Sequence, residues 1–156
     1  MSFNNILALL QTILFKNILI PIDLSNKSFH AFKIALDIAK KYDSKITILT
    51  CIQVDTWHHK FYDSRADAEL LKKQKKTITP HIEKLENLAN KSNISMKSQI
   101  LRSVSVVKDI TTYAKSRKFD LIVMGSHGRT GIDKLILGSV ANGVLQKSSC
   151  PVLIIK

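Results

Sequence analysis

Short apolar runs recur along the chain and alternate with segments of helical periodicity. The runs are 18–22, 46–52, 121–124 and 152–155, and each is rich in isoleucine or valine. Only 46–52 is clearly interrupted by polar residues, so the runs resemble strands that are covered on both faces, as in a parallel sheet. Residues 95–101 alternate more openly between apolar and polar side chains. We expect them to form a fifth strand, nearer an edge.

The segments between these runs have the period of helices. Two of them carry one apolar face each, made by Phe29, Phe32, Leu36 and Ala39 in the first and by Ile110, Tyr113 and Ala114 in the second. Residues 66–93 form a further helical region, in which we expect Pro80 to start a new helix with Thr79 as its cap. This order predicts an α/β fold: a three-layer sandwich around a five-stranded, parallel, doubly wound, Rossmann-like sheet.

The length of 156 residues and the hydrophobic content of 45% fit one globular domain. We assign 15–156 to this domain and 1–14 to an N-terminal appendage without the features of a secretory signal. No stretch approaches the roughly 20 apolar residues that a membrane-spanning helix needs. Cys51 and Cys150 are too few for a disulfide scaffold and suit a reducing compartment. We therefore expect a soluble, cytoplasmic protein.

The net charge of +12 favours anionic partners. The lysines are spread along the chain, which is typical of a solvated face, although nucleic acid is the alternative. Four of them, at 72, 73, 75 and 76, lie along one helical stretch that lacks interleaved aromatic residues for stacking on bases. We therefore expect no nucleic-acid partner.

Residues 54–64 have no clear period and predict a surface loop. This segment contains the adjacent pair His58 and His59, which could suggest a metal site. No third ligand lies nearby in the sequence, so we expect surface histidines and no metal centre.

A loop with well-spaced glycines follows the fourth strand. The strand ends at Gly125, Gly128 follows, and after nine further residues Gly138-Ser139 opens a helix. Glycine lets backbone N–H groups approach a ligand closely, and a helix N-terminus attracts phosphate. Ordinary turns with Ser139 as an N-cap are the alternative. Because neither G-x-G-x-x-G nor the P-loop pattern is present, the residues alone leave both interpretations open.

Asp23 follows the first strand. In a doubly wound sheet, ligands gather at the carboxyl ends of the strands where the strand order reverses. If the first and fourth strands are neighbours there, Asp23 faces the Gly125 loop. Its carboxylate could then accept hydrogen bonds from ribose hydroxyls or an adenine amino group. A turn residue beside Ser25 is the alternative.

Met-Gly-Ser-His-Gly-Arg-Thr-Gly occupies 124–131, Leu-Gly-Ser-Val occupies 137–140, and Cys-Pro-Val-Leu-Ile-Ile occupies 150–155. These motifs resemble the nucleotide (ATP)-binding branch of the universal stress protein family. Asn-Ile-Leu-Ile-Pro-Ile-Asp at 17–23 resembles that family's opening strand. The resemblance covers about 15–156 and implies a fold of the adenine-nucleotide α-hydrolase type.

The resemblance also implies a nucleotide site, with ATP or AMP as the ligand, accompanied or not by Mg²⁺. Asp23 would lie by the adenosine and Cys51 would line the adenine slot. The phosphates would lie against the glycine loop, where Arg129 is either a phosphate-binding cation or a solvated loop residue. The implied cofactor-binding residues are Pro21, Asp23, Cys51, Met124, Gly125, Gly128, Arg129, Gly138, Ser139 and Val140.

One turn departs from the family pattern. After its third strand the family usually has Gly-x-Pro, whereas the aligned positions here are Val104 and Val106. The turn therefore differs, and no nucleotide contact can be carried over from it.

Two classes of function fit these features. The first is a small regulatory module that holds a nucleotide and signals its occupancy to a partner. The second is a slow ATP hydrolase or a phosphoryl-transfer enzyme, but the sequence shows no paired carboxylates and no nucleophile elbow, so we assign no catalytic residue. The terminal apolar strand 152–155 predicts an exposed edge, and the resembling family commonly forms homodimers through it.

Overall fold

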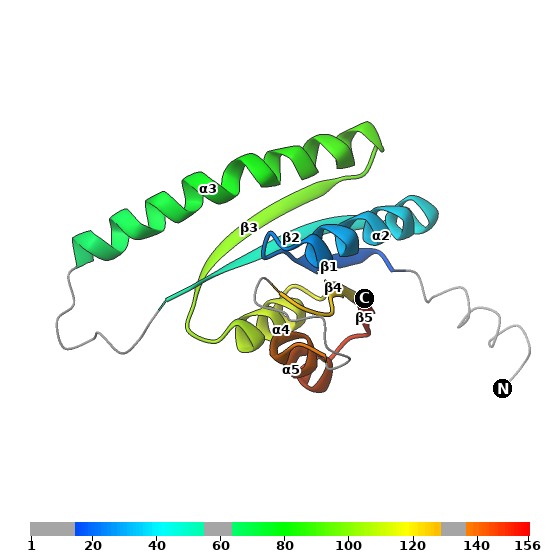
Figure 1. The fold of residues 1–156 in the computed structure, drawn as a ribbon. Helices are drawn as coiled ribbons and strands as arrows, with labels where there is room; N and C mark the ends of the chain where they lie inside the picture. The colour runs from blue at the N-terminus through cyan, green and yellow to red at the C-terminus, as the bar shows by residue number, and fades with distance from the viewer. Residues whose placement is uncertain (1–14, 55–63, 129–136) are drawn as a thin grey trace, which may run out of the picture.

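The computed structural model describes residues 15–54, 64–128 and 137–156. Strands and helices alternate along these residues, as Figure 1 shows. The strands are β1 (Asn17–Pro21), β2 (Lys45–Gln53), β3 (Met96–Ser103), β4 (Leu121–Gly125) and β5 (Val152–Ile155). The helices are α2 (Asn26–Tyr42), α3 (Ser64–Lys91), α4 (Val106–Ser116) and α5 (Ser139–Lys147). The appendage 1–14 and most of the loop expected at 54–64 lie outside the described residues.

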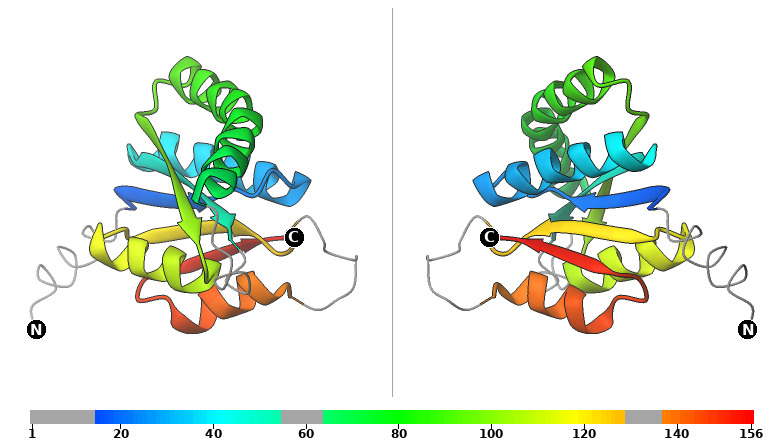
Figure 2. Two further views of the ribbon diagram at one scale, coloured as in Figure 1. Left: turned by 90° about the vertical axis from the view of Figure 1, so that its left-hand side faces the viewer. Right: turned by 90° about the vertical axis from the view of Figure 1, so that its right-hand side faces the viewer.

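The strands form one five-stranded sheet in the order β3-β2-β1-β4-β5, and every neighbouring pair is parallel. Helices α2 and α3 cover one face of the sheet and α4 and α5 cover the other (Figure 2). The predicted three-layer, doubly wound fold is therefore confirmed. From β1 the chain proceeds to β2 and β3 on one side, whereas β4 and β5 lie on the other side, so the order reverses between β1 and β4.

A side chain strengthens the pairing at this reversal. β1 and β4 are paired at Ile18↔Leu121 and Leu19↔Ile122. Just before these pairs, the carboxylate of Asp120 accepts hydrogen bonds from the backbone N–H groups of Lys16, at 2.9 Å, and Asn17, at 3.1 Å. These bonds tie the beginnings of the two strands together. Their carboxyl ends are thereby held side by side.

Helix α2 begins at a capped turn and lies on the sheet through small side chains. The Ser25 hydroxyl accepts a hydrogen bond from the backbone N–H of Ser28 at 3.2 Å, as an N-cap does. The centre of the buried stripe consists of Ala31, Phe32, Ala35 and Ala39. The predicted face was slightly displaced, because Phe29 and Leu36 are only partly buried against this core. The small residues let the helix lie close to β1 and β4.

Helix α3 corrects the prediction of a restart at Pro80. It is one helix of 28 residues with Pro80 inside it. The residues buried on either side of the proline, Ile78, Ile82 and Leu85, keep one helical phase, and Pro80 itself lies on the exposed side. Packing of this stripe therefore outweighs the local preference of proline for a first turn. Among the described residues no helix, α3 included, is long and apolar enough to cross a membrane.

We expect Pro80→Ala to stabilise the protein by about 1–3 kcal/mol, because proline inside a helix costs roughly 3 kcal/mol relative to alanine. Urea unfolding followed by circular dichroism measures the change in the free energy of unfolding. Thr79→Ala is the matched control. In a continuous helix it changes stability little, whereas loss of an N-cap would cost about 1 kcal/mol. A destabilised Pro80→Ala protein would contradict the continuous helix.

Candidate functional site

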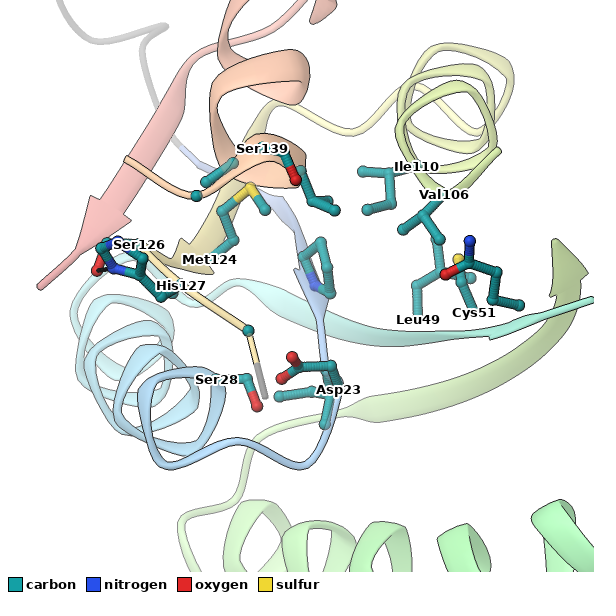
Figure 3. A pocket seen from close by; sticks show the side chains of 18 residues that line it. Asp23, Ser28, Leu49, Cys51, Val106, Ile110, Met124, Ser126, His127 and Ser139 are labelled. Atoms are coloured by element: carbon teal, nitrogen blue, oxygen red, sulfur yellow. Dashed lines mark hydrogen bonds between the residues drawn. The ribbon is translucent and has the colours of Figure 1, made fainter. Parts of the chain in front are cut away.

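A cavity of about 300 Å³ opens at the carboxyl ends of β1 and β4, where the strand order reverses. Its walls come from the ends of β1, β2 and β4, the loop after β4, and the first turns of α4 and α5. In Figure 3 the labelled side chains from these elements surround a common space. Doubly wound sheets hold ligands at this position. The cavity is therefore the candidate site.

The cavity brings the sequence-predicted site residues together. Those that the structure describes all line it, and they are Pro21, Asp23, Cys51, Met124, Gly125, Gly128, Gly138, Ser139 and Val140. Arg129 lies outside the described residues. Sequence reasoning missed other lining residues, among them Gln53, Val106, Ile110 and His127. The strand period of two that starts at Leu49 and Cys51 could have indicated Gln53.

The loop after β4 is packed so closely that two glycines have no room for a side chain. A Cβ atom on Gly125 would lie 2.9 Å from the backbone carbon of Lys27. A Cβ atom on Gly138 would lie 2.9 Å from the carbonyl oxygen of Ser126, which already accepts the Gly138 N–H at 2.9 Å. Ser126 in turn donates its N–H to the carbonyl of Ile155 at 2.8 Å. These glycines therefore have a packing role, whatever ligand they contact.

Helix α5 directs its N-terminus at the cavity. Gly138 is its N-cap residue and provides no side-chain cap, and the first turn contains no acidic residue. Ser139 and Val140 of this turn are both exposed and line the cavity. The first N–H groups of a helix have no partner within it, and the helix dipole adds positive potential there. This end of the cavity is therefore suited to an anion.

Asp23 makes the turn contacts of one alternative, and its position near the glycine loop is the one that the other alternative requires. One carboxylate oxygen, Oδ1, accepts hydrogen bonds from the Ser25 backbone N–H at 3.1 Å and from its hydroxyl at 2.6 Å, as in a turn. The other, Oδ2, lies 2.6 Å from the place that a Cβ atom on Gly128 would occupy. The carboxylate therefore faces the glycine loop, as predicted. Substitution of Gly128 by a larger residue would displace it.

The end of the cavity away from the glycine loop is apolar. Leu49 and Ile110 are each 1% exposed, and Val106 and Cys51 are partly buried. Figure 3 places Leu49, Cys51 and Val106 on one side, Ser126 and His127 on the other, and Asp23 between them. Of the two positions that depart from Gly-x-Pro, Val106 lines the cavity, while Val104 is 64% exposed.

Strand β2 continues beyond the end of its neighbour β1. The pairing of β1 with β2 ends at Pro21↔Leu49, and the last bond runs from the N–H of Ile22 to the carbonyl of Leu49 at 2.9 Å. On the other side, β2 stays paired with β3 as far as Gln53↔Ser103. The backbone of β2 after Leu49 therefore borders the cavity where β1 would otherwise lie.

The Cys51 thiol is a poor nucleophile. Burial, and secondarily the negative charge of Asp109, raises the pKa of Cys51 to about 11. The raised pKa keeps the group a neutral thiol at physiological pH. Because only the thiolate is strongly nucleophilic, Cys51 is unreactive. Its role in the cavity is that of a small, apolar wall residue. Among the described residues, no three His, Cys, Asp or Glu side chains gather as metal ligands would.

Comparisons with known proteins agree with this architecture. The model of the universal stress protein family matches residues 14–156. The universal stress protein MJ0531 of Methanocaldococcus jannaschii is 32% identical over 145 residues, which are 92% of this chain and 83% of that protein. The solved structure of protein MJ0577, reported as a structure-based assignment of biochemical function, is 26% identical with a TM-score of 0.82. It covers 92% of this chain and 97% of its own.

Other solved structures share the fold at lower identity. The universal stress protein UspA from Lactobacillus plantarum is 24% identical, with a TM-score of 0.82 over 93% of this chain and all 100% of its own. A universal stress protein in complex with cAMP is 21% identical, with a TM-score of 0.67 over 91% of this chain and 97% of its own. A universal stress protein from Archaeoglobus fulgidus in complex with dAMP is 19% identical, with a TM-score of 0.63. The match covers 92% of this chain and 100% of that protein's chain.

The family model spans nearly the whole chain, and its match agrees with the sheet order and with the position of the cavity at the β1–β4 reversal. The protein therefore belongs to the universal stress protein family.

Proposed function

We propose that this protein is a small regulatory module that holds an adenine nucleotide, ATP or AMP, in the cavity between β1 and β4. One observation carries the proposal: three chemically different environments follow one another along a single cavity. They are the N-terminus of α5 beside the glycine loop, the carboxylate of Asp23, and the apolar wall below β2. They correspond in order to phosphates, ribose and base.

The orientation of the nucleotide follows from charge. Phosphates are favoured at the N-terminus of α5 and are repelled by the Asp23 carboxylate. A carboxylate accepts hydrogen bonds from hydroxyl groups, which a ribose supplies in pairs. The purine then packs against the apolar wall, where the backbone groups at the free edge of β2 can hydrogen-bond to the polar edge of the ring. The net charge of +12 supports an anionic ligand in general terms.

The described residues do not by themselves form a Mg²⁺ site, since no cluster of three candidate ligands is present among them. Mg²⁺ commonly binds through substrate phosphates, water and one or two carboxylates. In this proposal Mg²⁺ would therefore enter with ATP, held mainly by phosphate oxygens and water.

Structural relatives and local chemistry favour binding over turnover. Structures of this fold have been solved with cAMP and with dAMP, both of which carry an adenine base. Hydrolysis needs a group that orients the attacking water. Asp23 is turned toward the cavity, but its Oδ1 is engaged by two donors of Ser25. We therefore propose regulation through nucleotide occupancy, and assign the nucleotide site to the domain 15–156.

Ser139→Ala should weaken ATP binding about tenfold to a hundredfold, because loss of a hydrogen bond to a charged group costs roughly 1.5–3 kcal/mol. Ser139 is exposed, so the fold should not change. Isothermal titration calorimetry measures the affinity. Ser149→Ala, which changes an exposed serine beyond the other end of α5, is the control and should bind as the wild type does. Equal affinities for Ser139→Ala and the wild type would contradict the proposed contact of the Ser139 hydroxyl with phosphate.

Asp23→Ala should weaken ATP and AMP by the same factor, about tenfold to a hundredfold, because its proposed contact is with the ribose that both share. Calorimetric titration of the variant with each nucleotide provides the comparison. Asp37→Ala, at an exposed position on α2, controls for the loss of one negative charge. An effect on ATP alone would place Asp23 near the outer phosphates and contradict the proposed orientation.

We further propose that the protein forms a homodimer through β5, which is an edge strand of the sheet. Its backbone groups at Val152 and Ile154 point away from β4, because the N–H groups of Ile122 and Ser126 donate to the carbonyls of Pro151 and Ile155. An unpaired edge of this kind tends to pair with another chain. Leu153 on this strand is 37% exposed.

Leu153→Lys should shift the dimer toward monomer, because a two-fold interface brings the two introduced charges close together. Light scattering at micromolar concentration measures the mass against the 17.6 kDa of one chain. Leu145→Lys, at a leucine on α5 that is 49% exposed, should leave the dimer intact. A wild-type mass equal to one chain would refute dimerisation.

A further inference from the structure

Gln53 closes the apolar end of the cavity with a polar group. Leu49, Cys51 and Gln53 alternate along β2 and line the same cavity, as the period of two in a strand requires. Leu49 is 1% exposed, Cys51 is partly buried, and Gln53 is exposed. Exposure of the wall residues therefore increases along β2, and the amide of Gln53 lies at the exposed end.

The Gln53 amide makes no hydrogen bond to the part of the chain that the structure describes. Its NH₂ group can donate two hydrogen bonds and its oxygen can accept two. On its β1 side, β2 is no longer paired after Leu49. The amide therefore lies beside a strand edge, in the same cavity lining as apolar side chains, and the described residues leave its hydrogen-bonding capacity unused.

A planar heteroaromatic ring fits these surroundings. Its faces are apolar and suit Val106, Ile110 and Cys51, while its edge carries donors and acceptors. If the phosphates lie at α5 and the ribose lies at Asp23, the base is the part that extends toward Gln53. This step rests on the function proposed above.

We propose that Gln53 is a specificity-determining residue, whose side-chain oxygen accepts a hydrogen bond from the 6-amino group of the bound purine. The amide adds a hydrogen bond to the apolar contacts that the wall supplies. The apolar side chains of the wall bind any flat ring, whereas the amide adds a contact that depends on the group at the 6-position. Turnover of ATP is not required for this role.

The test pairs a change in the protein with a change in the ligand. The two probes are ATP and purine riboside 5′-triphosphate, which lacks the 6-amino group and keeps the ribose and phosphates. The measured quantity is the ratio of their dissociation constants, in which effects on ribose and phosphate binding cancel. We expect the wild type to prefer ATP. In Gln53→Leu, the preference should fall about threefold to tenfold, the range for one neutral hydrogen bond.

Gln53→Glu separates hydrogen bonding from shape. A carboxylate keeps the acceptor, so this variant should retain the preference for ATP while both probes bind more weakly because of charge repulsion. Gln99→Leu, at an exposed amide on β3, is the control and should match the wild-type ratio.

The same preference for ATP in Gln53→Leu and in the wild type would overturn the proposal and leave nucleotide binding itself intact. Loss of the preference in Gln53→Glu would also overturn it. Failure of the wild type to bind ATP at all would instead contradict the proposed function, and the role of Gln53 with it.

Discussion

The parallel pairing of β1 with β4 is the constraint on which the rest of the site depends. Both strands are buried between two helical layers, and the Asp120 carboxylate fixes their beginnings through the backbone of Lys16 and Asn17. The chain leaves β1 for α2 on one face of the sheet, and it leaves β4 for α5 on the other. The two connections diverge toward opposite faces of the sheet, and such divergence leaves a crevice between the strand ends. The cavity is the direct result of this divergence, and Asp23 and the glycine loop face each other across it.

Much of the fold could be predicted from the sequence because the strands are nearly continuous apolar runs. The edge position of β3 followed from its open alternation, and the start of α5 followed from Gly138-Ser139. Pro80 was misjudged for a physical reason. The rule for proline is local, whereas the buried stripe through Ile78, Ile82 and Leu85 is a property of the whole helix. When that stripe keeps its phase across a proline on the exposed side, packing decides the outcome.

Some of the residues that line the cavity could be predicted from the sequence and others could not. The difference lies in which structural feature fixes the position of each residue. Asp23 and Gly125 lie at the ends of β1 and β4, so their positions follow once these strands are neighbours. Gln53 depends on where the pairing of β1 with β2 stops, which is a matter of register between strands. The period of two puts Gln53 on the same face of β2 as Cys51, but no local pattern encodes where the pairing with β1 stops. Val106 lines the cavity at the start of α4, where the usual family pattern is absent, so a motif comparison could not place it either.

Fixed charges determine how an anionic ligand can lie in this cavity, and they act at short range. The net charge of +12 attracts anions to the protein as a whole, but salt screens such attraction beyond about 10 Å. Within the cavity, the N-terminus of α5 and the carboxylate of Asp23 act in opposite senses on a phosphate. The carboxylate is held in place by two hydrogen bonds from Ser25. A nucleotide in the proposed site would therefore have one favoured direction. In this proposal, selectivity among bases depends on the groups at the other end, on β2 and in the first turns of α4, where apolar side chains and the Gln53 amide are available for recognition.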